Sequence, residues 1–108
     1  LSRIALLNGG AQDGIVKGNA VIGADGLVGS VMETGASSAR VLLLTDINSR
    51  VPVIGELSRE RTIAAGNNSP LLSLDYVENN TRLAVGERLL TSGDGGVFPP
   101  GIPVGVVT

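Results

Sequence analysis

Short Val- and Leu-rich segments separated by turn residues restrict the fold of this sequence more than any other feature. Sixteen glycines and five prolines are spread along 108 residues, and they interrupt the apolar segments about every eight to twelve residues. A surface helix needs a longer amphipathic stretch than these segments provide. The spacing is typical of a β-sandwich or β-barrel. We therefore predict an all-β domain built from hairpins.

The turn residues divide the chain into about eight predicted strands. An Asp25-Gly26 pair between β-rich flanks predicts a tight hairpin, because Gly26 can adopt the positive φ that such turns need. The polar residues 56–61 are interpreted as a second hairpin tip, with a helical turn as the alternative. The predicted strands lie within residues 3–7, 20–31, 39–45, 51–54, 62–66, 72–76, 87–91 and 102–107.

Three of these segments carry predictions about burial or position. Residues 39–45 are almost continuously apolar, which predicts a strand covered on both faces. Leu72, Leu74 and Tyr76 alternate with polar residues, which predicts a strand with one buried face. Pro52 has no amide hydrogen to donate, so we expect it at a sheet edge or at the start of its strand.

Two segments, residues 16–31 and 84–107, resemble each other. Each contains a strand that follows a glycine, then a connection, then a second strand with an internal glycine. The matching positions are Gly18 with Gly86 and Gly29 with Gly105. A glycine inside a strand admits a bend or the close approach of another backbone. The alternative is chance similarity between Val-rich strands; a true repeat predicts two related hairpin halves.

The composition excludes several classes of chemistry. The sequence has no His and no Cys, so these residues can form neither a Ser-His or Cys-His catalytic pair nor a thiolate metal site. The net charge is −2 and Lys17 is the only lysine, so no nucleic acid is expected as a partner. The ten carboxylates are explained by turn capping and solubility, with a glycosidase-type pair as the alternative. We expect no metal and no cofactor.

The chain shows no segment that could cross a membrane as a helix. Its longest aliphatic run, residues 41–44, is far shorter than the roughly 20 apolar residues that span a bilayer. We therefore expect this stretch of polypeptide to be soluble.

Candidate partner-binding residues lie in a Pro-rich loop. Pro99 and Pro100 fix φ and stiffen the chain, so an exposed Phe98 would be a preorganised anchor for a partner. The alternative is a structural corner that places Phe98 in the core, because a domain so poor in aromatic residues gains stability by burying its only Phe. Tyr76, the other aromatic residue, is a second candidate for contact with a partner.

Several motifs are similar to the extracytoplasmic β region of the MreC family of rod shape-determining proteins. The first is GAQDGIVKGNAV at residues 10–21, followed by DGLVG at residues 25–29. VLLLTD at residues 41–46 and SRVPV at residues 49–53 continue the match. The most specific motif is LTSGDGGVFPPGIPVG at residues 90–105. Within it, Asp94 departs from the family pattern, in which many members carry an apolar residue.

The resemblance implies an all-β fold of small six-stranded-type barrels, with a chymotrypsin-like topology that lacks catalytic residues. One MreC-like region would span residues 1–108 and could divide into two barrel halves with a boundary near residues 50–66. The resemblance also implies an inner-membrane protein whose transmembrane helix and coiled coil lie upstream of this region, which faces the periplasm or cell exterior.

The implied role is a non-enzymatic scaffold of the cell-wall elongation complex that organises peptidoglycan synthesis and rod cell shape. Its implied partners are a class B penicillin-binding transpeptidase, the MreB–MreD–RodA complex and a second copy of itself. Strand addition and a hydrophobic groove are the expected binding modes. Two alternatives remain: a carbohydrate-binding module that stacks Tyr76 or Phe98 on peptidoglycan sugars, and a degenerate hydrolase.

Overall fold

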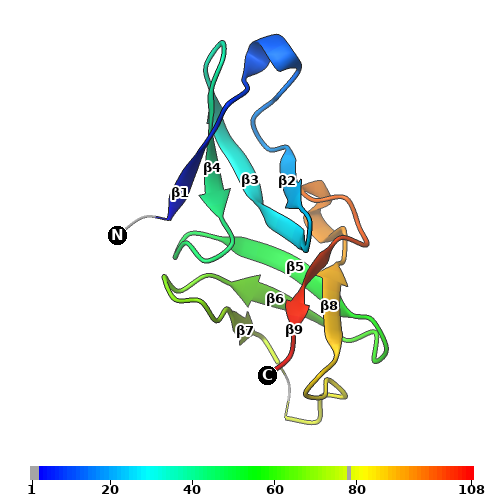
Figure 1. Ribbon diagram of the computed structural model, residues 1–108. Helices are drawn as coiled ribbons and strands as arrows, with labels where there is room; N and C mark the ends of the chain where they lie inside the picture. The colour runs from blue at the N-terminus through cyan, green and yellow to red at the C-terminus, as the bar shows by residue number, and fades with distance from the viewer. Residues whose placement is uncertain (1–2, 78) are drawn as a thin grey trace.

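The computed structural model describes residues 3–77 and 79–108, and within them the chain forms nine strands and two single-turn 3₁₀ helices. The strands form two sheets (Figure 1), one of four strands in the order β1-β4-β3-β2 and one of five in the order β7-β6-β5-β8-β9. The molecule is elongated, with extents of 48 × 27 × 23 Å. The predicted all-β fold is confirmed.

The elements lie in the segments that the turn residues delimit. The first sheet contains β1 (Ile4–Leu7), β2 (Ala20–Gly23), β3 (Gly26–Thr34) and β4 (Ala39–Leu43). The second contains β5 (Arg50–Gly55), β6 (Arg61–Ala65), β7 (Ser73–Asp75), β8 (Arg88–Thr91) and β9 (Pro103–Val106). The 3₁₀ helices are η1 (Ala11–Asp13) and η2 (Asp94–Gly96). The chain passes from one sheet to the other within residues 44–49.

Two predicted hairpins are confirmed. β2 and β3 are joined by a two-residue loop, and Gly26 at its end has φ 129°, a conformation that favours glycine. β5 and β6 pair antiparallel around residues 56–60, which form a turn rather than a helix.

Two predictions about strand position are wrong. β4 is not covered on both faces, because Arg40 is exposed between the buried Ala39 and Val41. Burial alternates along these three residues, although the segment as a whole is rich in apolar residues. Pro52 is in a central strand rather than at an edge or strand start, since β5 pairs with both β6 and β8. The proline is tolerated because it lies where pairing with β8 ends: the registered pairs begin at Val53, and beyond them the Pro52 carbonyl accepts the Ser92 amide at 3.0 Å. The missing amide therefore affects only the end of that ladder.

The predicted half-buried strand at residues 72–76 is confirmed only in part. Leu72 and Leu74 pack against the core, but the strand ends at Asp75. Tyr76 follows with φ 64° and is 84% exposed. Because its backbone is left-handed, Tyr76 does not continue the alternation of buried and exposed side chains along the strand. The apolar-polar periodicity of the sequence does not reveal this change of backbone conformation.

The two sheets share one hydrophobic core. Leu27 of β3 packs in the same buried cluster as Val53 of β5 and Leu89 of β8. Phe98 and Ile102, from the connection between β8 and β9, also belong to this cluster. The hairpin tip of the first sheet therefore rests on the second, and the two halves bury apolar surface together.

The internal repeat is confirmed by matching hydrogen bonds. The amide of Gly18 donates to the carbonyl of Val31 at 2.8 Å, and the amide of Gly86 donates to the carbonyl of Val107 at 2.8 Å. Gly18 has φ 94° and Gly86 has φ 93°. The β2–β3 and β8–β9 hairpins thus begin with the same left-handed turn and close it with the same bond.

The strand pairing of the two hairpins matches as well. Val21 pairs with Gly29, and the register shifts at the next residue of β2. Leu89 pairs with Gly105, and the register shifts at the next residue of β8. A β-bulge at the same place in both hairpins shows that these are two copies of one structural unit.

Candidate partner-binding surface

The structure contains no assembled group of potential metal ligands within residues 3–77 and 79–108. Among the carboxylates of the described residues, those of Asp46 and Glu87 are buried. Both accept hydrogen bonds from backbone amides, so their burial has a structural explanation. The interpretation of the acidic residues as caps is confirmed for these two.

Asp46 stabilises the junction between the sheets. Its side chain accepts the amide of Arg3 at 2.6 Å and the amide of Asn48 at 2.8 Å. The Asn48 amide, followed by the Arg3 amide, holds the pKa of this carboxyl below its usual value. A side chain at Gly66 would collide with the Asp46 carbonyl, so this glycine is required by close backbone packing.

Glu87 has the corresponding role at the far end of the second sheet. Its Oε2 accepts the amide of Ser58 at 2.6 Å and the amide of Leu57 at 2.9 Å. The Ser58 amide is the largest cause of a pKa below the usual carboxyl value. Glu87 therefore fixes the β5–β6 hairpin tip against the start of β8.

Thr91 organises the Pro-rich loop between β8 and β9. Its hydroxyl donates to the carbonyl of Pro99 at 2.6 Å and accepts the amide of Ile102 at 2.8 Å. The Thr91 side chain is almost fully buried. The loop is thus held at its centre by a side chain that sequence inspection did not single out. A Thr at the last position of a strand before a Pro-rich loop is the only sequence signal for it.

The loop buries Phe98 and exposes the residues around it. Phe98 is 7% exposed and belongs to the core cluster, which matches the structural-corner alternative rather than an exposed anchor. Val97, Pro99 and Pro100 are exposed. Contact with a partner through this loop stays a prediction, and it would have to use these three residues because the Phe98 ring is not accessible.

Asp94 ties the same loop to the neighbouring hairpin. Nη1 of Arg61 lies 2.8 Å from Oδ1 and 2.9 Å from Oδ2 of Asp94. Arg61, and then the hydroxyl of Ser92, lower the pKa of this carboxyl. Both charged side chains are more than half exposed, so the pair contributes little net stability. Asp94, the residue at which the sequence departs from the pattern of the family it resembles, thus has a local contact with Arg61.

Tyr76 does not belong to the core cluster that contains Phe98. Its exposed ring follows β7, beside a small hollow lined by residues that include Arg61, Thr62 and Leu83. The structure therefore does not bring the two predicted aromatic candidates together into one site. Binding by Tyr76 stays a prediction.

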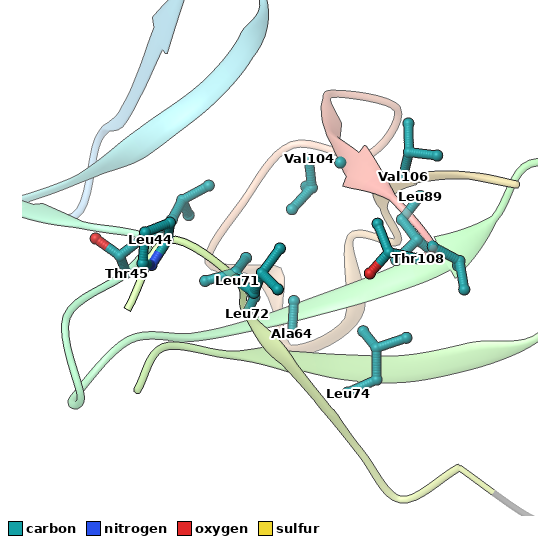
Figure 2. A pocket seen from close by; sticks show the side chains of 13 residues that line it. Leu44, Thr45, Ala64, Leu71, Leu72, Leu74, Leu89, Val104, Val106 and Thr108 are labelled. Carbon is teal, nitrogen blue, oxygen red and sulfur yellow. The ribbon is translucent and has the colours of Figure 1, made fainter. Parts of the chain in front are cut away.

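An apolar groove separates the two edge strands of the second sheet, β7 and β9. Figure 2 shows Leu71, Leu72 and Leu74 on one side and Val104 and Val106 on the other. The groove has a volume of about 560 Å³, and its floor includes the core residues Ala64 and Leu89. Sequence reasoning predicted a hydrophobic groove as a binding mode but not its location, because its walls come from segments more than 25 residues apart in the chain.

No helix within residues 3–77 and 79–108 is long and apolar enough to cross a membrane. The chain's resemblance to known proteins extends over its whole length. A family model described as "Rod shape-determining protein MreC, barrel core" matches residues 1–108.

Two relatives show the extent of the similarity. The cell shape-determining protein MreC of Cereibacter sphaeroides is 45% identical over 102 residues, which are 94% of this chain and 34% of that protein. The protein of the same description from Caulobacter vibrioides is 46% identical over 100 residues, 93% of this chain and 29% of that protein. The chain thus spans about a third of the length of these relatives.

Solved structures are similar in fold as well. The crystal structure of MreC from Pseudomonas aeruginosa has a TM-score of 0.93 at 38% identity, covering 97% of this chain and 68% of that one. The MreC structure from Listeria monocytogenes has a TM-score of 0.85 at 35% identity, covering 95% of this chain and 51% of that one.

Proposed function

This chain belongs to the MreC family of cell shape-determining proteins, and we propose that it acts as a non-enzymatic scaffold of the cell-wall elongation complex. It would organise peptidoglycan synthesis from the extracytoplasmic side of the inner membrane. The proposed partners are a class B penicillin-binding transpeptidase, MreB, MreD and RodA, and a second copy of the protein. Any membrane attachment would come from segments outside residues 1–108.

The observation that best supports a scaffold is the combination of a rigid backbone and exposed apolar side chains. Thr91 and Glu87 are buried and fix two loops by hydrogen bonds, while Val97 and Leu57 on those loops are 58% and 82% exposed. Exposed aliphatic residues on preordered loops bind a protein partner with little further loss of entropy. The absence of His and Cys from the sequence leaves neither an imidazole base nor a thiol nucleophile in these residues.

The test is binding of the purified periplasmic part of a class B transpeptidase to this chain and to single-residue variants. We expect Val97→Asp to weaken binding at least tenfold, because it places a charge in an apolar contact. Pro100→Ala should weaken it less, through a more flexible loop. Val16→Asp, at a valine that is 59% exposed in the first half of the chain, is the matched control.

Two results would contradict this proposal. Failure of the wild-type chain to bind any elongation-complex protein would remove the scaffold role. Unchanged affinity of a correctly folded Val97→Asp variant would remove the Pro-rich loop from the interface. Phe98→Ala is unsuitable as a probe because Phe98 is buried, so loss of binding could reflect unfolding.

A carbohydrate-binding role is the second candidate, and the observation that favours it is the exposed Tyr76 ring. Sugar-binding modules stack aromatic rings on apolar sugar faces. Titration with muropeptides should shift the Tyr76 ring resonances if this reading is correct, and the Tyr76→Ala variant should lose the interaction. If the Tyr76 ring resonances do not shift at millimolar muropeptide, carbohydrate binding by this residue is excluded.

A further inference from the structure

Asn8 follows β1 directly and is the only asparagine of the sequence that precedes a glycine. Its side chain is exposed, whereas Gly9 is buried. Within residues 3–77 and 79–108, neither the Asn8 side chain nor the Gly9 backbone amide has a hydrogen-bond partner. A buried backbone amide without a protein partner is rare in folded proteins, so this pair of residues is chemically unusual.

The remaining asparagines, at positions 19, 48, 67, 68, 79 and 80, all precede a residue that carries a side chain. Two of them are also held by hydrogen bonds to distant or neighbouring backbone. Oδ1 of Asn19 accepts the amide of Val16 at 2.9 Å, and Oδ1 of Asn68 accepts the amide of Ile47 at 2.9 Å. Asn8 is therefore set apart both by its freedom to rotate and by the residue that follows it.

The chain between β1 and η1 is anchored to the turn that joins β3 and β4 (Figure 1). Ala11 donates its amide to the carbonyl of Gly35 at 2.9 Å, and Gln12 donates to the carbonyl of Ala36 at 3.0 Å. A side chain at Gly10 would collide with the Gly35 carbonyl. Because these backbones are in close contact, a change in the length of the chain before Gly10 would disturb the anchor.

We propose that Asn8 is a site of spontaneous deamidation in the folded protein, with water as the only co-reactant. The Gly9 backbone nitrogen loses its proton and bonds to Cγ of Asn8, while the bond from Cγ to Nδ2 breaks. The Asn8 amide nitrogen leaves as ammonia, which takes up the proton. Water then opens the succinimide ring at either of its carbonyls and gives aspartate or isoaspartate. Glycine favours the attack because it has no Cβ beside the attacking nitrogen.

The isoaspartate product has a structural consequence. It adds one methylene group to the main chain between β1 and Gly9, and it adds a carboxylate that is ionised at neutral pH. The lengthened chain cannot keep both Ala11 and Gln12 on the turn between β3 and β4. Deamidation therefore loosens this end of the first sheet as the protein ages. The proposal does not depend on the scaffold role.

The test is peptide mapping by mass spectrometry of the purified folded protein during incubation at neutral pH. We expect Asn8 to deamidate at least about tenfold faster than any other asparagine of the chain. Gly9→Ala should slow the reaction by a similar factor, and its new Cβ would crowd only the flexible end of the Ile15 side chain. Gly35→Ala, whose Cβ meets only ordinary contacts, is the matched control and should leave the rate unchanged.

Amide hydrogen exchange measures the structural consequence. Ala11 and Gln12 should exchange several times faster in the isolated isoaspartate form than in the unmodified protein. Asn8→Asp has the new charge without the extra methylene group and should keep their protection. Unchanged exchange of both amides in the isoaspartate form would remove the loosening of the first sheet.

Three results would overturn the site itself. These are an intact Asn8 after prolonged incubation, a rate at Asn8 no faster than at the other asparagines, and a rate that Gly9→Ala does not change. Deamidation that occurs in the urea-unfolded chain but not in the folded protein would count against it equally, because the fold would then protect Asn8.

Discussion

Gly29 of β3 lies against the carbonyl oxygen of Leu42 in β4, so closely that no side chain fits between the two strands. The contact occurs beside the β-bulge that follows the pair between Val21 and Gly29. A bulge bends its strand and increases the local twist. The glycine is required by the close packing of β3 against β4 rather than by its own φ angle.

Gly29→Ala is expected to destabilise the protein by about 1–3 kcal/mol, because the added methyl group must displace the β4 backbone. Chemical denaturation followed by circular dichroism measures the change. Gly35→Ala is the control, since its new Cβ would meet only ordinary contacts with Ser38. Equal stability of the two variants would show that β4 can move away at no cost.

Gly18→Ala and Gly86→Ala should each cost about 1–2 kcal/mol, because both glycines have a left-handed backbone and neither is crowded. The space around them leaves backbone strain as the main cause. The two losses should be similar, since the two turns are copies of one unit. Losses that differ severalfold in thermal and chemical denaturation would contradict the energetic equivalence of the hairpins.

Thr91→Val should destabilise the protein by about 1–3 kcal/mol, although valine has nearly the same shape. It removes the hydroxyl and leaves the buried Ile102 amide and the Pro99 carbonyl without this partner. Thr91→Ser keeps both bonds and is the matched control. Amide exchange at Ile102 should accelerate in the valine variant alone, and equal exchange in the two variants would argue against the hydroxyl's role.

Stability should decrease as the pH falls below about 4, the ordinary range of carboxyl pKa values. The pKa values of Asp46 and Glu87 are lowered in the folded state, so the unfolded chain binds protons first. Their contribution is complete above the unfolded-state pKa and is lost as pH falls through the folded-state pKa. Unfolding midpoints between pH 7 and pH 2.5 measure this dependence.

The double variant Asp46→Asn, Glu87→Gln tests the source of that pH dependence. It should be less stable at pH 7 and should lose less stability on acidification than the wild type. An unchanged acid profile would assign the dependence to other carboxylates, for example Asp94, whose pKa is also lowered.

Local sequence signals located the strands and the repeat but not the environment of each residue. The Asp25-Gly26 pair and the glycines at 18 and 86 act on the backbone within a few residues, so their effects can be inferred from the sequence. Pro52 was misplaced because its position depends on where β8, more than 30 residues later, stops pairing. Tyr76 was misplaced because one left-handed residue ends the alternation on which the burial prediction depended.

The sequence by itself determined the all-β class, the hairpins, the repeated unit and the lack of imidazole and thiol chemistry, because composition, periodicity and turn preferences are local properties. Only the tertiary structure decided that Phe98 is buried while Val97 is exposed, that Thr91 and Glu87 fix the loops, and that leucines and valines from distant segments form one groove. Those features depend on which strands become neighbours, and that choice is made by burial of a shared core around Leu27, Val53 and Leu89.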